Sequence, residues 1–263
     1  RSAVAGADDD AAEWASGPLA PADAETFGDW SFDLWATVES NAPNASAALD
    51  RITLEMFNGL GLMQHFGLDA GCLKRFLHRV DVAMSLRRNP YHNRFHSFDV
   101  AQSVFVIATR MSCSDYLGPL ELLALLVSAL CHDLEHPGHN NAFAVNASTP
   151  LAVRYNDSSP LENHHIAVAW TILRSAGCGL LAPLEESQCK RFRKLMITSI
   201  LATDMTCHFA LKEELDGVIL RNQPPSPSSS EAMAALRISQ SESGGGGGGL
   251  NDDDDGGGGG GGG

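Results

Sequence analysis

Histidine is the residue type that most clearly points to chemistry in this sequence. The chain has ten histidines, and seven of them fall between His92 and His165. A globular domain rarely gathers imidazoles in this way without a metal to bind or protons to transfer. Together with nearby acids and amides they form four short segments, which are the candidate site: Tyr91–Val100, His132–Asn141, Leu161–His165 and Ile200–Met205.

The first segment reads YHNRFHSFDV, so His92 and His96 stand four positions apart. If both lie on one helix, for which Pro90 offers a nearby start, their side chains share a face about 6 Å apart. Such a pair suits metal binding or acid–base catalysis. Two ordinary surface or capping histidines would give the same pattern, so the spacing alone leaves both interpretations open.

The second segment follows the apolar run PLELLALLVSALC, which predicts a buried helix over 119–131. Directly after it, His132 and Asp133 place an imidazole nitrogen beside a carboxylate that can bridge two ions. Mixed nitrogen and oxygen ligands suit zinc or iron paired with a harder magnesium or manganese ion. The alternative is a solvated polar helix end, but two histidine clusters in one chain favour a metal.

The segments LENHH and ILATDM each add an acid. Glu162 precedes paired histidines near the start of a predicted helix, where a carboxylate can orient imidazoles by hydrogen bonding. Ser158 or Ser159 is expected to cap this helix. Asp204 lies in a largely apolar segment predicted to be helical, and burying an acid there is costly unless it is paired or bound to metal. An exposed position on an amphipathic helix is the alternative.

Apolar residues recur at helical spacing around these segments, and strand-like alternation is almost absent, so the sequence predicts an all-α fold. Gly and Pro separate the expected helices, which cover 46–66, 69–86, 97–112, 119–131, 139–146, 161–175, 185–205 and 208–221. Three regions are predicted: a flexible acidic leader over 1–29, a folded domain over 30–222, and a low-complexity Pro/Ser/Gly/Asp tail over 223–263.

Charge and cysteine content limit the partners and cellular settings that the sequence favours. The net charge of −14 belongs to the ends, because residues 30–222 hold 19 acids and 16 bases. A basic surface for nucleic acid is therefore not expected. Six cysteines without a Cys-x-x-Cys pair indicate reduced thiols and a cytoplasmic setting. The longest apolar run, 122–131, is too short to cross a bilayer, so membrane attachment would need sequence upstream of Arg1.

In this order and spacing, the segments NPYHNRFHSFDV, HDLEHPGHNN, LENHH and ILATDM resemble the catalytic domain of the class I 3′,5′-cyclic nucleotide phosphodiesterases, which are HD-type metal phosphohydrolases. The resemblance covers about residues 30–221. The stretch LAVRYNDSSPLENHH is most similar to the high-affinity cyclic-GMP branch. The family implies an all-α domain that hydrolyses cyclic GMP or cyclic AMP to the 5′-monophosphate in signal transduction. The implied partners are the cyclic nucleotide and, in a homodimer, a second copy of the chain.

The resemblance also implies the catalytic groups and metal ligands. His92 matches the general acid that protonates the leaving 3′ oxygen. His96, His132 and Asp133 match metal ligands, with Asp133 bridging a zinc ion and a magnesium or manganese ion. The hydroxide between these two ions is the family's nucleophile, and Glu162 matches a residue that orients the reacting groups.

Further roles follow from the same resemblance. His136 and His165 match positions that orient the general acid and the metal-bound waters. Asp204 matches a residue that holds water on the second metal. Tyr91 and Asn163 match residues that line the family's substrate pocket.

Beyond ILATDM the sequence departs from the family pattern. A further metal-ligand Asp, the glutamine that recognises the purine and an aromatic clamp are expected there, but the chain enters Pro/Ser/Gly sequence. The glycine-flanked acids at 252–255 could hold a ligand only at a large entropic cost. Uncovered apolar faces and a partly molten chain are therefore expected. The alternative functions are an inactive module that only binds metal or a partner, and another HD-type phosphohydrolase.

Overall fold

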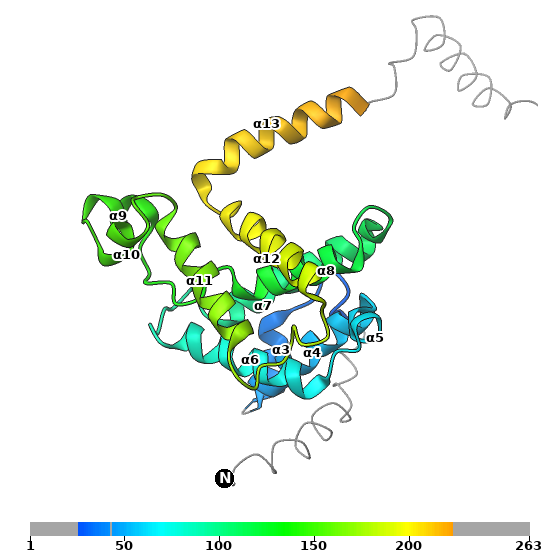
Figure 1. Cartoon of the computed structure of the whole chain (residues 1–263). Coiled ribbons are helices and arrows are strands. Elements are labelled where there is room, and N and C mark those ends of the chain that lie inside the picture. The colour runs from blue at the N-terminus through cyan, green and yellow to red at the C-terminus, as the bar shows by residue number, and fades with distance from the viewer. Residues whose placement is uncertain (1–25, 43, 223–263) are drawn as a thin grey trace, which may run out of the picture. The chain divides into compact units, whose positions relative to one another are not determined.

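The structure, a computed structural model, describes residues 26–42 and 44–222, and within these ranges it contains helices and no strand (Figure 1). The all-α prediction is confirmed. The chain divides into two units, Arg1–Phe209 and Ala210–Gly263, and the candidate site lies wholly in the first. In chain order the elements are α3 (Leu34–Ser40), α4 (Ala45–Gly59), α5 (Leu62–Phe66), α6 (Ala70–Ser85), α7 (Arg94–Arg110), the 3-10 helix η1 (Cys113–Asp115), α8 (Pro119–Cys131), α9 (Asn141–Asn146), α10 (Pro150–Arg154), α11 (Pro160–Arg174), α12 (Glu186–Leu201) and α13 (Met205–Asn222).

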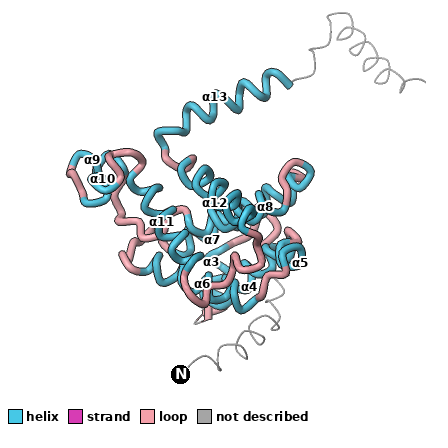
Figure 2. The backbone as a smooth tube through the Cα atoms, in the orientation of Figure 1, coloured by secondary structure: helices cyan, strands magenta, loops and turns pink. Residues whose placement is uncertain are grey.

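Helix α8 is the centre of the first unit. It begins with Pro119 in the first turn, where the missing amide hydrogen costs no hydrogen bond, and it buries nine of its residues. A helix that is apolar on all sides must be covered on all sides, and α7 and α12 make its most extensive contacts (Figure 2). The helix ends at Cys131, so His132 and Asp133 emerge directly from the core.

Large side chains from several helices join α8 in one core. Phe57 of α4, Phe76 of α6 and Phe192 of α12 are fully buried with Leu126 of α8. Each such side chain contributes about 1.5–3 kcal/mol to the hydrophobic stabilisation. This core holds α7, α8 and α12 in place. The first candidate segment runs into α7, the second follows α8, and the fourth lies at the end of α12.

The start of α7 is anchored by charge. Arg94, the first residue of the helix, forms ion pairs with Asp50 of α4 and Asp81 of α6, the latter at 3.2 Å. A positive charge is unfavourable at a helix N-terminus, so these two acids are needed to hold it there. They also fix the position of His96, which lies less than one turn further along α7.

Four helices differ from the prediction by three residues or more, and three of these differences have a local cause. The helix expected over 46–66 is two helices, because Gly61 adopts a left-handed conformation with φ of 69°. The helix expected over 97–112 begins at Arg94, where the Asn93 side chain accepts from the Phe95 amide as an N-cap. The helix expected over 185–205 ends at Leu201, so Asp204 lies in a turn. The helix expected over 208–221 begins at Met205, and the short helices α3 and α10 were not predicted.

The described residues contain no helix that is long and apolar enough to cross a membrane. Residues 1–25 and 223–263, which hold nearly all of the expected leader and the whole of the expected tail, lie outside the described residues. The predictions made for them, including the expectation for the acidic run at 252–255, are therefore untested.

Candidate metal and catalytic site

The predicted site residues surround one cavity of about 560 Å³. Its wall is formed by the loop before α7, the first turns of α7, the end of α8, the start of α11 and the turn after α12. Eight of the ten predicted residues line it: Tyr91, His92, His96, His132, Asp133, His136, Glu162 and Asp204. The cavity has a histidine end, made by His92, His96, His132 and His136 around Asp133, and an acidic end, made by Glu162 and Asp204.

The two remaining residues, His165 and Asn163, do not line the cavity. His165 is almost fully buried, and its Nε2 atom lies 3.8 Å from Oδ1 of Asp133. Asn163 does not line this cavity, and its side-chain amide donates to the backbone carbonyls of Ser158 and Ser159, at 2.9 and 3.1 Å. The structure thus brings nine predicted residues together, and the substrate role of Asn163 stays a prediction.

The pairing of His92 with His96 has a different origin from the one expected. Their spacing would place them on one face if both were helical, but His92 precedes the N-cap of α7 and only His96 is helical. Their ring centroids are nevertheless 5.7 Å apart. The loop before Asn93 therefore brings His92 over the helix, and the proximity does not depend on helical spacing.

Asp133 is the point on which the histidines converge. Its Oδ2 atom lies 3.1 Å from Nε2 of His132, 3.3 Å from Nε2 of His96 and 3.9 Å from Nε2 of His92. Burial alone would raise the pKa of Asp133, but hydrogen bonds from His132 and His96 outweigh it and hold the pKa well below its usual range. The carboxylate is therefore ionised, and it stands just past the negative C-terminal end of α8.

The backbone fixes how His132 faces this carboxylate. Nδ1 of His132 lies 2.8 Å from the Ala129 carbonyl, which can only accept a hydrogen bond, so Nδ1 carries a proton. In the neutral ring, Nε2 then directs a lone pair at the carboxylate, and the two would repel. Burial lowers the pKa of His132, but the Asp133 carboxylate outweighs this effect and raises it. A cation, either a proton or a metal ion, therefore belongs between the two groups.

The donor set fits a metal ion. His96, His132 and Asp133 each offer one atom, and these atoms lie within 4.8 Å of one another; His92, Asp133 and His136 form a second such group. Two imidazoles and one carboxylate are typical ligands of zinc or a similar ion. The bond from His132 to the Ala129 carbonyl is the kind of outer contact that orients metal-binding histidines.

His136 and His165 are neutral supporting groups. Burial lowers the pKa of His136 to about 4, with a further contribution from neighbouring His92. Burial likewise lowers the pKa of His165 to about 3, although Asp133 acts in the opposite direction. Nδ1 of His165 contacts the Leu134 carbonyl at 2.6 Å, which fixes the ring orientation. Burial also lowers the pKa of His92, despite the Asp133 charge.

The acidic end is held by neutral partners. Asn141 donates to Glu162 at 2.8 Å, and burial raises the pKa of Glu162. Ser159 donates to Asp204 at 2.7 Å, and the Thr206 amide donates to it at 2.9 Å. Burial would raise the pKa of Asp204, but these bonds outweigh it and lower the pKa. With 4% of its surface exposed, Asp204 is not the exposed helical residue that the alternative interpretation required.

Sequence reasoning missed two of these partners. Asn141 also accepts from the Leu161 amide, at 3.1 Å, and so ties the start of α9 to the start of α11. Ser159 was expected as a helix cap, but its hydroxyl makes no capping bond and is directed to Asp204 instead. Asn141 is the last residue of the HDLEHPGHNN segment, so the sequence had already placed it in a candidate segment. Nothing in the sequence indicated which acid it contacts.

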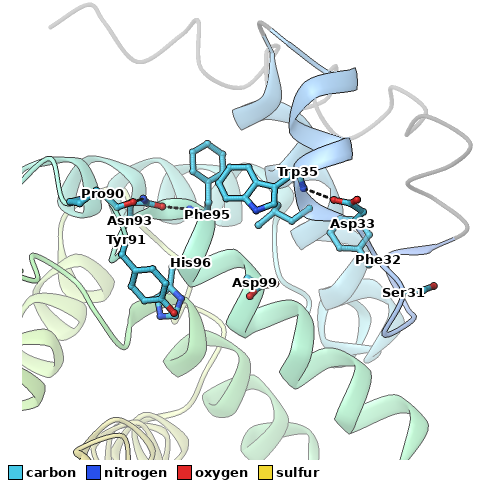
Figure 3. A pocket seen from close by; sticks show the side chains of 11 residues that line it. Ser31, Phe32, Asp33, Trp35, Pro90, Tyr91, Asn93, Phe95, His96 and Asp99 are labelled. Carbon is cyan, nitrogen blue, oxygen red and sulfur yellow. Dashed lines mark hydrogen bonds between the residues drawn. The ribbon is translucent and has the colours of Figure 1, made fainter.

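A second cavity, of about 500 Å³, adjoins the histidine end (Figure 3). The rings of Trp35 and Phe95 form part of its wall, with centroids 5.5 Å apart, and Tyr91 lies against His96 with centroids 4.8 Å apart. Tyr91 and His96 line both cavities. Because 64% of the Tyr91 surface is exposed, its ring is available to contact a bound molecule at the mouth of the site.

Comparisons with known proteins agree with this geometry. A family model described as 3′5′-cyclic nucleotide phosphodiesterase matches residues 91–240. The cyclic-nucleotide phosphodiesterase regA of Dictyostelium discoideum is 40% identical over 185 residues, which are 70% of this chain and 22% of that protein. The human high affinity cGMP-specific 3′,5′-cyclic phosphodiesterase 9A is 38% identical over 210 residues, which are 78% of this chain and 34% of that protein.

A solved structure is similar as well. The phosphodiesterase domain of the RhoPDE fusion protein from the choanoflagellate Salpingoeca rosetta superposes with a TM-score of 0.67 at 31% identity, covering 79% of this chain and 60% of that one. The chain therefore spans about a fifth to a third of the two curated relatives and under two thirds of this structure. The family match covers more than half of the chain and includes all ten predicted site residues, so the chain belongs to the 3′,5′-cyclic nucleotide phosphodiesterase family.

Proposed function

We propose that this chain contributes the metal-binding and proton-donating groups of an enzyme that hydrolyses 3′,5′-cyclic nucleotides to 5′-monophosphates. The observation that carries the proposal is the convergence of His92, His96 and His132 on the partly buried, ionised carboxylate of Asp133. A phosphodiester is itself an anion, so its hydrolysis needs concentrated positive charge and a proton for the departing oxygen.

Metal binding follows from the donor set. His96, His132 and Asp133 would hold one divalent ion, for which zinc is the best chemical match. Asp133 would share a second ion with the acidic end, where oxygen ligands suit magnesium or manganese. When bound, such ions lower the pKa of water to give a nucleophile at neutral pH and stabilise negative charge on the phosphorus oxygens.

The chain's own residues then divide the remaining work. His92 directs Nε2 into the cavity and donates the proton to the leaving 3′ oxygen. Asp204, whose lowered pKa keeps it ionised, accepts hydrogen bonds from water at the acidic end. Glu162, whose pKa is raised by burial, exchanges a proton with that water more readily than an exposed carboxylate does. The exposed ring of Tyr91 packs against the nucleotide.

The preferred cyclic nucleotide, the cellular location and the oligomeric state of the chain are separate parts of the proposal. Relatives of this chain include proteins named as cGMP-specific and others named as dual specificity enzymes. We favour cyclic GMP as the substrate on the resemblance of residues 151–165 to the cyclic-GMP branch. The cytoplasmic setting and the homodimer stay predictions.

The test is hydrolysis of cyclic GMP and cyclic AMP by the purified chain with zinc and magnesium. The expected result is metal-dependent turnover that His96→Ala reduces to background and His78→Ala leaves unchanged. His78 is the matched control because it lies exposed on α6, away from the cavity. Turnover that survives His96→Ala would contradict the proposal.

The two alternative functions have their own outcomes. A chain that retains stoichiometric metal but hydrolyses neither nucleotide is a metal-binding module. Hydrolysis of simple phosphate esters without hydrolysis of cyclic nucleotides would identify another HD-type phosphohydrolase. Either result would refute cyclic nucleotide hydrolysis by this chain.

A further inference from the structure

A small cavity lies beside the first turns of α7 and shares no lining residue with the two large cavities described above. Its volume is about 20 Å³, and residues of α4, α6, α7 and α8 line it. Half of these residues are apolar, and the other half are polar: Thr53, Asp81, Arg94 and Ser97. A polar cavity of this size has room for one water molecule.

Two polar atoms of the lining residues have no hydrogen-bond partner in the protein. They are Nε of Arg94 and Oγ of Ser97, and both are buried. Among the described residues, only one other buried side-chain nitrogen or oxygen, Nδ1 of His164, likewise lacks a partner. Burying such an atom unpaired costs free energy, so native proteins rarely do it. Two of the three atoms belong to one small cavity, which points to a partner that they share.

The other contacts of Arg94 leave Nε as a donor in need of an acceptor. The terminal nitrogens of its guanidinium pair with Asp50 and Asp81 and donate to the Ser46 carbonyl at 2.9 Å. The guanidinium is planar and all of its nitrogens can only donate, so these contacts restrict the direction of the Nε–H bond. The hydroxyl of Ser97 can donate or accept. A water molecule can satisfy it in either case.

We propose that this cavity is a binding site for one buried water molecule that links Arg94 and Ser97 of α7 to Asp81 of α6. The water accepts a hydrogen bond from Nε of Arg94 and forms a second with Oγ of Ser97. A hydrogen of the water is donated to the carboxylate of Asp81, which lines the same cavity. Three hydrogen bonds are typical of a buried water. The site does not depend on the proposed function.

This water would support the turn that carries His96. Arg94 stands two positions before His96 and Ser97 one position after it, and His96 lines the larger cavity with the other histidines. The ion pair of Arg94 with Asp81 already joins α7 to α6 at this point. The water adds a second link between the same two helices, and it satisfies two polar atoms that would otherwise be buried at a cost.

A crystal structure of the full chain, at a resolution that shows ordered waters, tests the site directly. The expected result is one density peak at about 2.6–3.2 Å from both Nε of Arg94 and Oγ of Ser97. The proposal is overturned if both side chains are ordered and no peak lies between them. It is also overturned if the Ser97 hydroxyl instead bonds the Asn93 carbonyl, four positions earlier, because that bond removes its need for a water.

Ser97→Ala tests the site in solution, because the two possibilities predict opposite signs. If Oγ binds the water, its removal loses a hydrogen bond, and the equilibrium constant for unfolding in urea should rise about fivefold. If Oγ has no partner, alanine removes a buried unpaired hydroxyl, and the constant should fall. Unfolding is measured with the full chain in EDTA, so that metal binding at neighbouring His96 does not contribute.

Ser128→Ala is the matched control. Ser128 is 3% exposed, compared with 2% for Ser97, and it also lies inside a helix, but its hydroxyl donates to the Ala124 carbonyl at 2.6 Å. Both variants lose a buried hydroxyl and gain the higher helix propensity of alanine, whereas only Ser97→Ala removes a contact to the water. A larger loss of stability in Ser97→Ala than in Ser128→Ala supports the proposal. An equal or smaller loss, or a gain, would overturn it.

Discussion

The two ends of the cavity hold their carboxylates in opposite ways. At the histidine end, Asp133 faces imidazoles that become cationic or bind a cation. At the acidic end, Glu162 and Asp204 face the neutral amide of Asn141 and the neutral hydroxyl of Ser159. Charged partners compete with a metal for the carboxylate, whereas neutral partners orient it and leave its charge in place.

This difference indicates two modes of metal binding. The histidine end offers nitrogen and oxygen atoms within 4.8 Å of one another, close enough for direct ligation of one ion. The acidic end offers oxygens that already hold protein hydrogen bonds, which suits an ion that keeps its own waters. The comparison therefore predicts a tightly held ion at one end and an exchangeable ion at the other.

Asp133→Asn should have the largest effect on metal content and activity, because Asp133 is proposed to bind the ion at each end of the cavity. We expect metal content after gel filtration, measured by mass spectrometry, to fall from stoichiometric to background, and cyclic nucleotide hydrolysis to disappear with it. Asp157→Asn, an exposed substitution with the same change in charge, should retain both. Stoichiometric zinc in the Asp133→Asn chain would contradict the assignment of this residue as the shared ligand.

Asp204→Asn should have the next largest effect and should separate the two ends. We expect it to keep zinc but to raise the magnesium concentration for half-maximal activity about 10- to 100-fold, because Asp204 acts on the exchangeable ion. His96→Ala should lose zinc itself. If Asp204→Asn loses zinc as completely as His96→Ala does, the two ends are one site.

Ser159→Ala should weaken the same ion more mildly. It removes the hydroxyl that donates to Asp204 and leaves the carboxylate in place. Losing one such bond costs about 1 kcal/mol, which corresponds to about a fivefold rise in the magnesium requirement. Ser158→Ala, one residue away, is the matched control. Titration of activity with magnesium measures the magnesium requirement, which should be largest for Asp204→Asn, smaller for Ser159→Ala and unchanged for Ser158→Ala.

The smallest effect is expected in the pH dependence of stability without metal. The pKa values of His136, about 4, and His165, about 3, lie below the ordinary value of 6.5. The unfolded chain therefore binds protons that the folded chain excludes, so stability falls as pH drops from 6.5 towards 4. His132, with its raised pKa, acts in the opposite direction. The pKa of Glu162 is raised, so Glu162 also acts in the opposite direction.

Urea unfolding of the EDTA-treated chain at pH 7 and pH 5 measures this balance. The unfolding midpoint should be lower at pH 5. His165→Asn should reduce the difference between the two pH values, and Glu162→Gln should enlarge it. A chain that is more stable at pH 5 than at pH 7 would show that His132 and Glu162 together outweigh His136 and His165.

Prediction from sequence succeeded where a local signal marked the boundary. Helix α8 was predicted over 119–131, its observed bounds, because Pro119 and a continuous apolar run define it. Helix α11 was placed within one residue because Pro160 marks its start. The break at Gly61 was missed, since one glycine in an apolar pattern does not reveal a left-handed conformation.

The site shows the same limit. The residue types and their order predicted which side chains gather, and the structure brings nine of the ten together. The turn at Asp204 was wrongly predicted as helical, because the apolar pattern continues past the end of α12. Partners such as Asn141 and Ser159 depend on contacts between distant segments, which no local pattern encodes.

The convergence on Asp133 also has a consequence for folding kinetics. His96 lies 37 positions before this carboxylate and His165 lies 32 positions after it. These groups meet only after the long intervening segments have closed, and closing such loops is slow and comes late. A bound metal should therefore add most of its stabilisation after the rate-limiting step of folding. It would prolong the lifetime of the native chain while leaving the refolding rate nearly unchanged.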